Sequence, residues 1–312
     1  VFMARKQKKS SPRIVWWVVA LLALGAAVWY GMQDDGKNAL TTLMPAAVQE
    51  AIGGSEKDKE KKAAEEKAKE KTKEAVKAVG DAKNAIPEPS GEIKARLAIV
   101  IDDFGYTSGP IAALAALPRP VTFAILPYRP HSAEALQAAK ASGKEAILHL
   151  PMMPQQASAA SEDNTISPSM SDSEIRSTVE KALRSLPGVV GVNNHQGSLA
   201  TADSRVMKQV LALLHSRGLF FVDSRTSSQS VGRTTARQLG VPAAENDLFL
   251  DNVDEVDAVK QKMRTAGNLA LRSGSAVVIG HARMHTATAL REVIPELERK
   301  GIRLVFVSRL TE

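Results

Sequence analysis

Short apolar runs rich in β-branched residues alternate with longer amphipathic stretches from residue 95 to residue 312. The runs lie at 97–101, 121–126, 145–150, 189–192, 219–222, 247–250, 276–279 and 303–307. The amphipathic stretches predict helices at 111–117, 133–142, 172–186, 204–217, 254–273 and 288–300. Short strands that are apolar throughout and separated by helices are typical of a parallel sheet covered on both faces.

This repetition predicts an α/β fold, a distorted (β/α)7-8 barrel with mostly parallel strands. The competing doubly wound fold usually has a glycine-rich phosphate-binding turn after its first strand. The stretch "IDDFGYTSGP" at 101–110 has two acids at that position instead. Both the number of units and this turn favour the barrel.

The N-terminal region has the features of a membrane anchor. Residues 14–32, "IVWWVVALLALGAAVWYGM", carry no charge and approach the length that a bilayer-spanning helix needs. Aromatic residues cluster toward the two ends of this stretch, and the basic cluster within 1–13 should stay cytoplasmic. We therefore predict a transmembrane helix or signal anchor at 14–32, with a cleaved signal peptide as the alternative.

A linker rich in Lys, Glu and Ala at 33–94 separates this helix from the domain at 95–312. It has few apolar residues for a core, so we interpret it as a spacer, with a partner-binding coil as the alternative. This topology predicts a single-pass inner-membrane protein whose C-terminal domain is periplasmic.

Composition excludes several classes of function. The 312-residue chain has a formal net charge of +7, but the cluster within 1–13 supplies most of the excess, so nucleic-acid binding is not expected. The absence of cysteine excludes disulfides, thiolate metal sites and cysteine nucleophiles. A serine hydrolase is disfavoured because no G-x-S-x-G motif is present.

Polar side chains follow most of the predicted strands. They are Asp102 and Asp103, His149, Asn193 to His195, Asp223 to Arg225, Asp251 and Asn252, and His281. In a parallel barrel the carboxyl ends of the strands meet on one face, where enzymes of this architecture place their chemistry. We expect these residues to share one site.

Acids together with histidines are ligands for a borderline divalent metal, with zinc as our prediction and cobalt, nickel or manganese as alternatives. Asp102 and Asp103 are adjacent, just past a predicted buried strand, and cannot both point the same way, so we expect one to bind the metal and the other to handle a proton. His195 is the strongest ligand candidate because its setting is polar and tightly turned, and His149 is a second. His281 is better suited to act as a general acid or to bind substrate.

Asp223 has two interpretations. It orients a histidine by a hydrogen bond, or Asp223, Ser224 and Arg225 form a polar turn in which Arg225 pairs with Asp223 or Asp251. We assign Asp223 to the catalytic group, and Asn194, Ser224 and Arg225 to substrate binding.

The segments "IVIDDFG", "FAILPY", "EAILHLPMMP", "VGVNNHQGS", "FFVDSRT", "LFLDN", "VVIGH" and "LVFVS" carry a family resemblance. As an ordered set they resemble the divergent polysaccharide deacetylases, a branch of the carbohydrate esterases. The resemblance covers about residues 95–310 and implies a distorted (β/α) barrel and metal-dependent removal of N- or O-acetyl groups from polysaccharide.

The resemblance also implies roles for single residues. Asp102 matches the proton acceptor, Asp103 a metal ligand, His149 the first metal histidine, and His281 the late histidine that protonates the leaving group. The family pattern has a second histidine four places after the first, where this chain has Met153. His195 is the candidate to supply the missing ligand. The family's arginine motif has no clear counterpart.

We therefore expect a metal-dependent hydrolase acting on peptidoglycan or another envelope polysaccharide. The alternative is a catalytically inactive glycan-binding or scaffold protein that kept the barrel, motivated by Met153 and the missing arginine motif. A third hypothesis is a hydrolase of phosphate esters or glycosidic bonds on the same strand ends.

Overall fold

The computed structural model of the chain describes residues 91–156 and 164–312. The predicted cytoplasmic segment at 1–13, the predicted transmembrane helix at 14–32 and residues 33–90 of the predicted linker lie outside the described residues. Within the described ranges, no helix combines the length and apolar character needed to span a membrane.

The strands form one sheet in which every named pair is parallel. They are β1 (Ala95–Phe104), β2 (Thr122–Ile125), β3 (Glu145–Met152), β4 (Gly191–Gln196), β5 (Phe220–Asp223), β6 (Ala243–Glu245), β7 (Leu248–Phe249), β8 (Ser275–His281) and β9 (Ile302–Val305). Their order is β6-β5-β4-β3-β2-β1-β8-β7, and β9 pairs with the first half of β1. The predicted parallel α/β fold is confirmed, as a half-barrel consistent with a (β/α) barrel.

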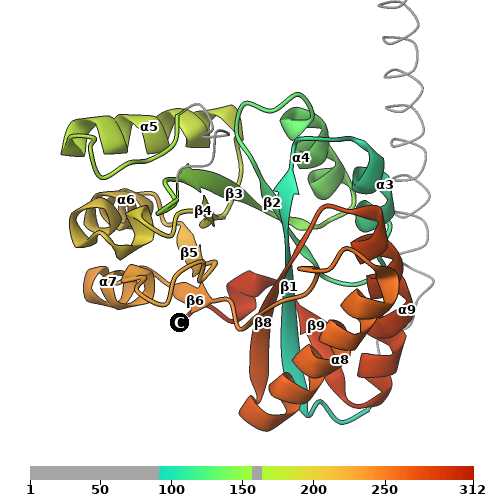
Figure 1. Ribbon diagram of the computed structural model, residues 1–312. Helices are drawn as coiled ribbons and strands as arrows, with labels where there is room; N and C mark the ends of the chain where they lie inside the picture. Colours follow the sequence, from blue (N-terminus) through green and yellow to red (C-terminus); the bar gives the residue numbers. More distant parts are fainter. Residues whose placement is uncertain (1–90, 157–163) are drawn as a thin grey trace, which may run out of the picture. The chain divides into compact units, whose positions relative to one another are not determined.

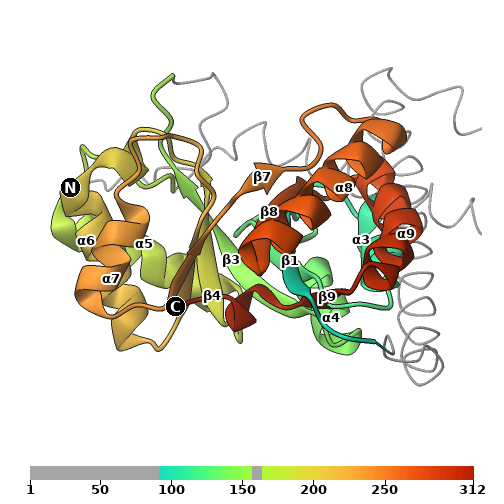
Figure 2. The same ribbon diagram turned by 90° about the horizontal axis from the view of Figure 1, so that it is seen from below.

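Helices follow the strands and cover the outer side of the sheet. They are α3 (Gly109–Ala115), α4 (Ser132–Ala141), α5 (Asp172–Ser185), α6 (Ser204–Ser216), α7 (Gly232–Leu239), α8 (Val256–Ser273) and α9 (Met284–Arg299), with short 3₁₀ turns η2 (Ala200–Ala202) and η3 (Val307–Arg309). Figures 1 and 2 show the strands between one group formed by α5, α6 and α7 and a second group that includes α3, α8 and α9. The longer helices bury an apolar stripe against the sheet, as in α6, where Val206, Val210 and Leu214 are spaced at four residues.

Two apolar cores lie on the two faces of the sheet. The larger core packs the helices against the outer face. The smaller core contains residues of the strands together with Val307 of η3, so it lies on the inner face, away from the helices. Its members are Ala98, Val100, Ala124, Ile147, Phe220, Val222, Ala244, Val277, Ile279 and Val307.

The inner core determines where the polar strand ends point. Side chains two positions apart in a strand lie on the same face. Asp102 therefore continues the inward-facing row of Val100, His149 that of Ile147, and His281 that of Ile279. At the carboxyl ends of the strands, the apolar interior gives way to polar side chains that face one another.

The strands extend further than the apolar runs predict. The predicted strand at 189–192 stops before Asn193, whereas β4 continues to Gln196, and β1 includes both acids. Apolar character ends where the interior opens to the polar site, but the backbone ladder continues. The structure also contains α7 and β6, which the apolar pattern of the sequence does not predict; α7 buries only small residues, and β6 has 3 residues.

Candidate metal centre

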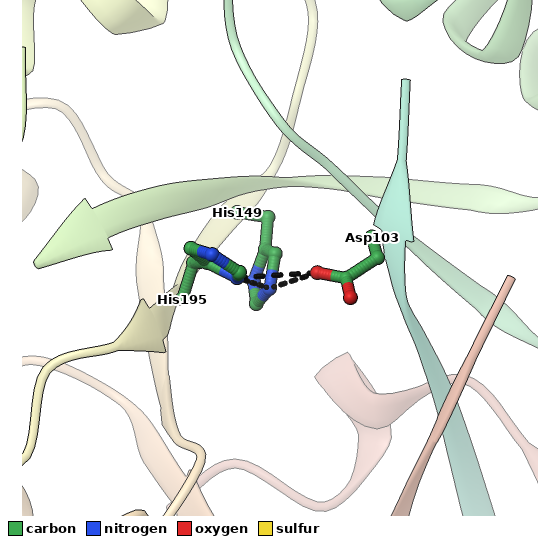
Figure 3. Close-up of side chains that lie close together, drawn as sticks. All are labelled: Asp103, His149 and His195. Atoms are coloured by element: carbon green, nitrogen blue, oxygen red, sulfur yellow. Dashed lines mark hydrogen bonds and ion pairs between the residues drawn. The ribbon is translucent and has the colours of Figure 1, made fainter. Parts of the chain in front are cut away.

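Three side chains from three strands converge at the carboxyl end of the sheet. Asp103 of β1, His149 of β3 and His195 of β4 each offer a ligand atom, and these atoms all lie within 4.8 Å of one another. Figure 3 shows the three side chains pointing toward one another. Asp103 Oδ1 lies 3.1 Å from His195 Nδ1 and 3.3 Å from His149 Nε2, and the two ring nitrogens are 3.0 Å apart.

The chemistry of this cluster fits a divalent metal. Asp103 Oδ1 is buried, yet no hydrogen bond of normal geometry reaches it, although two imidazole nitrogens lie close by. A buried carboxylate oxygen without a hydrogen bond is costly in the absence of a cation. One carboxylate oxygen and two imidazole nitrogens form a donor set suited to zinc and similar borderline metals.

Asp103 reaches the cluster through an unusual backbone conformation. Its φ angle is 64°, in the left-handed region, and the pairing of β1 with β2 shifts register between Ile101 and Phe104. This irregularity turns Asp103 toward the side that Asp102 already faces, so that Asp102 Oδ2 also lies 3.6 Å from His149 Nε2. The expectation that the two acids point different ways is wrong, because the left-handed backbone at Asp103 brings its carboxylate to the same side as that of Asp102.

The two acids nevertheless ionise differently. Burial raises the pKa of Asp102 to about 6, and the facing His149 only partly offsets that effect. Burial acts in the same direction on Asp103, but the adjacent imidazoles of His149 and His195 outweigh it and hold the pKa of Asp103 well below its usual range. The pKa of His149 is raised, because the attraction of the two acids exceeds the effect of its burial. Burial lowers the pKa of His195.

His281 stands on the other side of Asp102 and is held by a buried acid. Its Nδ1 lies 2.7 Å from Asp251 Oδ1, while Asp251 Oδ2 accepts hydrogen bonds from the backbone N–H of His281 and the hydroxyl of Thr286, both at 2.7 Å. Burial alone would lower the pKa of His281, but Asp251 raises it above its ordinary value. The ring of Phe249 stacks on the imidazole at 6.3 Å between centroids.

These groups line one open pocket of about 260 Å³. Its lining residues are Asp102, Asp103, His149, Asn194, His195, Gln196, Ser224, Thr226, Phe249, Asn252 and His281. The pocket therefore brings together the predicted metal ligands, the predicted proton acceptor and the predicted proton donor.

The structure does not bring Asp223 to a histidine. Asp223 is fully buried, and its carboxylate accepts hydrogen bonds from Arg225 N at 2.9 Å and Ser230 Oγ at 2.5 Å. These contacts match the polar-turn interpretation. Arg225 forms its ion pair with Glu245, at 3.5 Å, in place of the predicted pairing with Asp223 or Asp251. The histidine-orienting acid is Asp251.

Asn194 and Ser224 lie in the pocket wall, but each is occupied by internal hydrogen bonds. Asn194 Oδ1 accepts from Ser224 N at 2.8 Å and its Nδ2 donates to the carbonyl of Gln196 at 2.7 Å. The Ser224 hydroxyl donates to the carbonyl of Asn194 at 2.8 Å. Both residues thus join the ends of β4 and β5 by hydrogen bonds.

The sequence alone predicts no individual role for Asn193 or Phe249 and no pairing of Asp251 with His281. The available signal for Asn193 is its position two residues before His195, on the same face of β4. The signal for Asp251 is its place directly after the apolar run "LFL". Neither signal identifies the partner, which is remote in sequence although it lies nearby in the folded sheet.

A half-barrel of parallel strands with acids and histidines at their carboxyl ends is the architecture of a polysaccharide deacetylase-like domain. A sequence profile described as divergent polysaccharide deacetylase matches residues 99–311, and the chain belongs to this family.

Two sequence relatives and one solved structure extend the comparison. An uncharacterized protein of Haemophilus influenzae is 36% identical over 217 residues, which are 70% of this chain and 77% of that protein. The uncharacterized protein YibQ of Escherichia coli K12 is 35% identical over 202 residues, covering 65% of this chain and 63% of that protein. The crystal structure of an uncharacterized protein from Agrobacterium tumefaciens C58 superposes with a TM-score of 0.66 at 22% identity, over 72% of this chain and 92% of that chain, and shows the same fold.

Proposed function

We propose that the chain is a metal-dependent deacetylase that hydrolyses N- or O-acetyl groups of an envelope polysaccharide. The observation that carries this proposal is the composition of the pocket. Three ligand groups lie at its floor, with the buried acid Asp102 beside them and the His281–Asp251 pair at its wall. Membership of the divergent polysaccharide deacetylase family supports the proposed substrate class.

In this proposal Asp103, His149 and His195 hold a divalent metal, with zinc as the expected ion. When bound, such an ion supplies a Lewis acid that polarises the acetyl carbonyl and lowers the pKa of water. All three residues reach the cluster from different strands of one sheet, so their relative positions are set by the fold before any ion binds.

Asp102 accepts the proton of the attacking water. Its Oδ1 is held by a hydrogen bond from Asn193 Nδ2 at 2.8 Å, while its Oδ2 faces the ligand cluster. A general base must lie within hydrogen-bonding reach of the water that it deprotonates, and Oδ2 is the atom in that position.

His281 donates a proton to the departing amine or alcohol. Asp251 binds its Nδ1, so Nε2 is the nitrogen available to a substrate in the pocket. The negative charge of Asp251 favours the protonated imidazole, which is the form that a general acid needs.

The structure around Met153 weakens one argument for an inactive scaffold protein. Met153, which stands where the family pattern has a second histidine, packs against the outer core, and its sulfur accepts a hydrogen bond from Ser167. The third ligand position is supplied by His195 from the neighbouring strand. Loss of one motif residue therefore does not remove the cluster.

Metal content and acetate release test the proposal together. The purified chain is expected to contain one equivalent of zinc or a similar metal by elemental analysis, and the His195→Ala variant to lose it. Acetate release would be assayed on peptidoglycan, penta-N-acetylchitopentaose and acetylated xylan, with Asp102→Asn as the inactive control. A chain that carries no metal after supplementation and releases no acetate from any of the three contradicts the proposal and favours the scaffold.

The same proposal includes a location at the outer side of the inner membrane, anchored by residues 14–32. The support is the uncharged stretch and the basic cluster before it. A reporter active only in the periplasm, fused after residue 312, is expected to be active in cells. Activity of a cytoplasmic reporter at the same position is the opposite result and would reject this topology.

A further inference from the structure

We propose that Asn193 is a positioning residue that sets both the tautomer of the metal ligand His149 and the orientation of the proton acceptor Asp102. The inference rests on the proposed function, and it assigns a role to a side chain that touches neither substrate nor metal in that scheme. The geometry that carries it is a directed chain of hydrogen bonds through one buried carboxamide.

The carboxamide of Asn193 contacts three side chains from three other strand ends. Asn193 is fully buried. Its Oδ1 lies 2.9 Å from His149 Nδ1, and its Nδ2 donates to Asp102 Oδ1 at 2.8 Å and to Ser224 Oγ at 3.2 Å. One acceptor and two donors thus each have a partner.

Ser224 determines the orientation of the Asn193 carboxamide, that is, the positions of its oxygen and its NH₂ group. Its hydroxyl group donates its hydrogen bond to the carbonyl of Asn194 at 2.8 Å, so its oxygen can only accept a hydrogen bond from Asn193. Asp102, as a carboxylate, accepts as well. The Nδ2 group must therefore face Asp102 and Ser224, and Oδ1 must face His149.

This orientation determines the tautomer of His149. Because Asn193 Oδ1 can only accept, the hydrogen lies on His149 Nδ1. In the neutral ring the lone pair is then on Nε2, the nitrogen that lies 3.3 Å from Asp103 Oδ1 and 3.0 Å from His195 Nδ1. A hydrogen bond to the far nitrogen of a ligating imidazole is a common way to orient it toward a metal.

The same carboxamide restrains Asp102 by one oxygen. With Oδ1 bound to Nδ2, rotation of the carboxylate is restricted, and Oδ2 stays on the side of the cluster. The alternation of β4 explains why this residue is available, because positions 193 and 195 face the same side of the strand. One strand therefore supplies both a ligand and the group that orients a second ligand.

Substitutions at 193 separate these contacts. Asn193→Leu has a similar volume and makes no hydrogen bond, whereas Asn193→Asp keeps an acceptor for His149. Thr122→Val is the matched control, because Thr122 is also fully buried and hydrogen-bonded, to Glu145 at 2.9 Å, but at the amino end of β2. All variants would be made in the full chain.

The first readout is the imidazole ¹H–¹⁵N NMR spectrum of the metal-free chain, which requires neither metal nor activity. We expect a slowly exchanging Nδ1–H signal of His149 in the wild type, in Thr122→Val and in Asn193→Asp, and its loss in Asn193→Leu. The second readout is zinc affinity by competition with a chromophoric chelator. Asn193→Leu is expected to bind zinc about 10- to 100-fold more weakly than the wild type, and Asn193→Asp no more weakly than the wild type.

A His149 Nδ1–H signal and wild-type zinc affinity in Asn193→Leu would overturn the inference. If that variant does not fold, the Asn193→Asp variant decides, because loss of both the signal and the affinity there is also incompatible with the assigned role. A wild type that shows the signal and binds zinc but releases no acetate contradicts the proposed deacetylase and leaves the role of Asn193 intact.

Discussion

The adjacent acids Asp102 and Asp103 share a backbone segment but have different partners. Asp103 faces two imidazoles, whereas Asp102 faces one of them, accepts a hydrogen bond from the amide of Asn193 and is more deeply buried. Facing imidazoles favour the ionised carboxylate and burial favours the neutral acid; the imidazoles outweigh burial at Asp103, whereas burial outweighs His149 at Asp102. This difference in ionisation supports the proposed roles, in which Asp103 is a metal ligand and Asp102 is the proton acceptor.

Replacing each acid by its amide separates these two roles. Asp102→Asn keeps an oxygen that accepts from Asn193, so the metal content is expected to stay at the wild-type level while kcat falls about 10²- to 10⁴-fold. Asp103→Asn removes the anionic ligand and is expected to lose metal and activity together. Elemental analysis and acetate release on the same preparations would measure both. Normal metal content in Asp103→Asn would contradict the ligand assignment.

The pair of Asp251 and His281 predicts a pH effect. Asp251 raises the pKa of His281, so the protonated form needed by a general acid persists to higher pH and is lost as pH rises through that pKa. In Asp251→Asn this support is removed, the pKa of His281 falls, and the alkaline limb of the kcat profile is expected to move to lower pH. Thr286→Val, which removes a neutral contact to Asp251, serves as the comparison and is expected to shift the limb less. An unchanged limb in Asp251→Asn would exclude His281 as the group that sets it.

Sequence identifies residues of the site better than their partners. Asp102, Asp103, His149, His195 and His281 are recognised because each stands near or shortly after the end of an apolar run. The link between Asn193 and Asp102 joins positions 91 residues apart, and that between Asp251 and His281 spans 30 residues. Such contacts depend on strand order and register, which residue spacing does not reveal. The left-handed φ of Asp103 cannot be predicted from the sequence either.

At the level of strands, the inner core is tightly fitted where β4 meets β5. Gly191 pairs directly with Phe220 in register, and the aromatic ring lies over the glycine. A Cβ atom at position 191 would lie 2.4 Å from Phe220 Cε2, closer than two non-bonded carbon atoms can approach. Gly191 therefore makes room for an aromatic ring that fills the interior beneath Asn193 and His195.

Gly191→Ala is expected to lower the free energy of unfolding by about 1–3 kcal/mol, the usual range for overpacking a core. The double variant Gly191→Ala/Phe220→Leu removes ring atoms that cause the clash, so its loss should be smaller than the sum of the two single losses. Denaturant unfolding of the three variants and the wild type measures the coupling. Strictly additive losses would mean that the glycine is required for another reason.

The elements that sequence predicts correctly are those with long or strongly apolar patterns. The runs that became β1, β3, β5 and β8 are evident because they are buried on both faces. In contrast, the polar second half of β4 resembles a loop, because its inward side chains face the pocket rather than the core. The weakly apolar α7 and the short β6 lack a pattern long enough to detect.

At the scale of the domain, the ligand cluster joins segments that are remote in sequence. Asp103 and His149 belong to β1 and β3, which are not neighbours in the sheet, and His195 adds β4. An ion held by all three would bind the folded sheet and not the unfolded chain, in which these residues are far apart. Metal binding is then coupled to global stability and not only to catalysis.

Zinc is therefore expected to stabilise the folded chain by about 2.7 kcal/mol when its free concentration is 100 times the dissociation constant. Denaturant midpoints with buffered zinc and with excess chelator would measure this shift. Asp103→Asn is the control, because it keeps both histidines and loses the carboxylate that connects β1 to them. It should show little or no shift at the same zinc concentration. An equal shift in this variant would mean that zinc acts at another site, and the convergence of the strand ends would then not be what the ion stabilises.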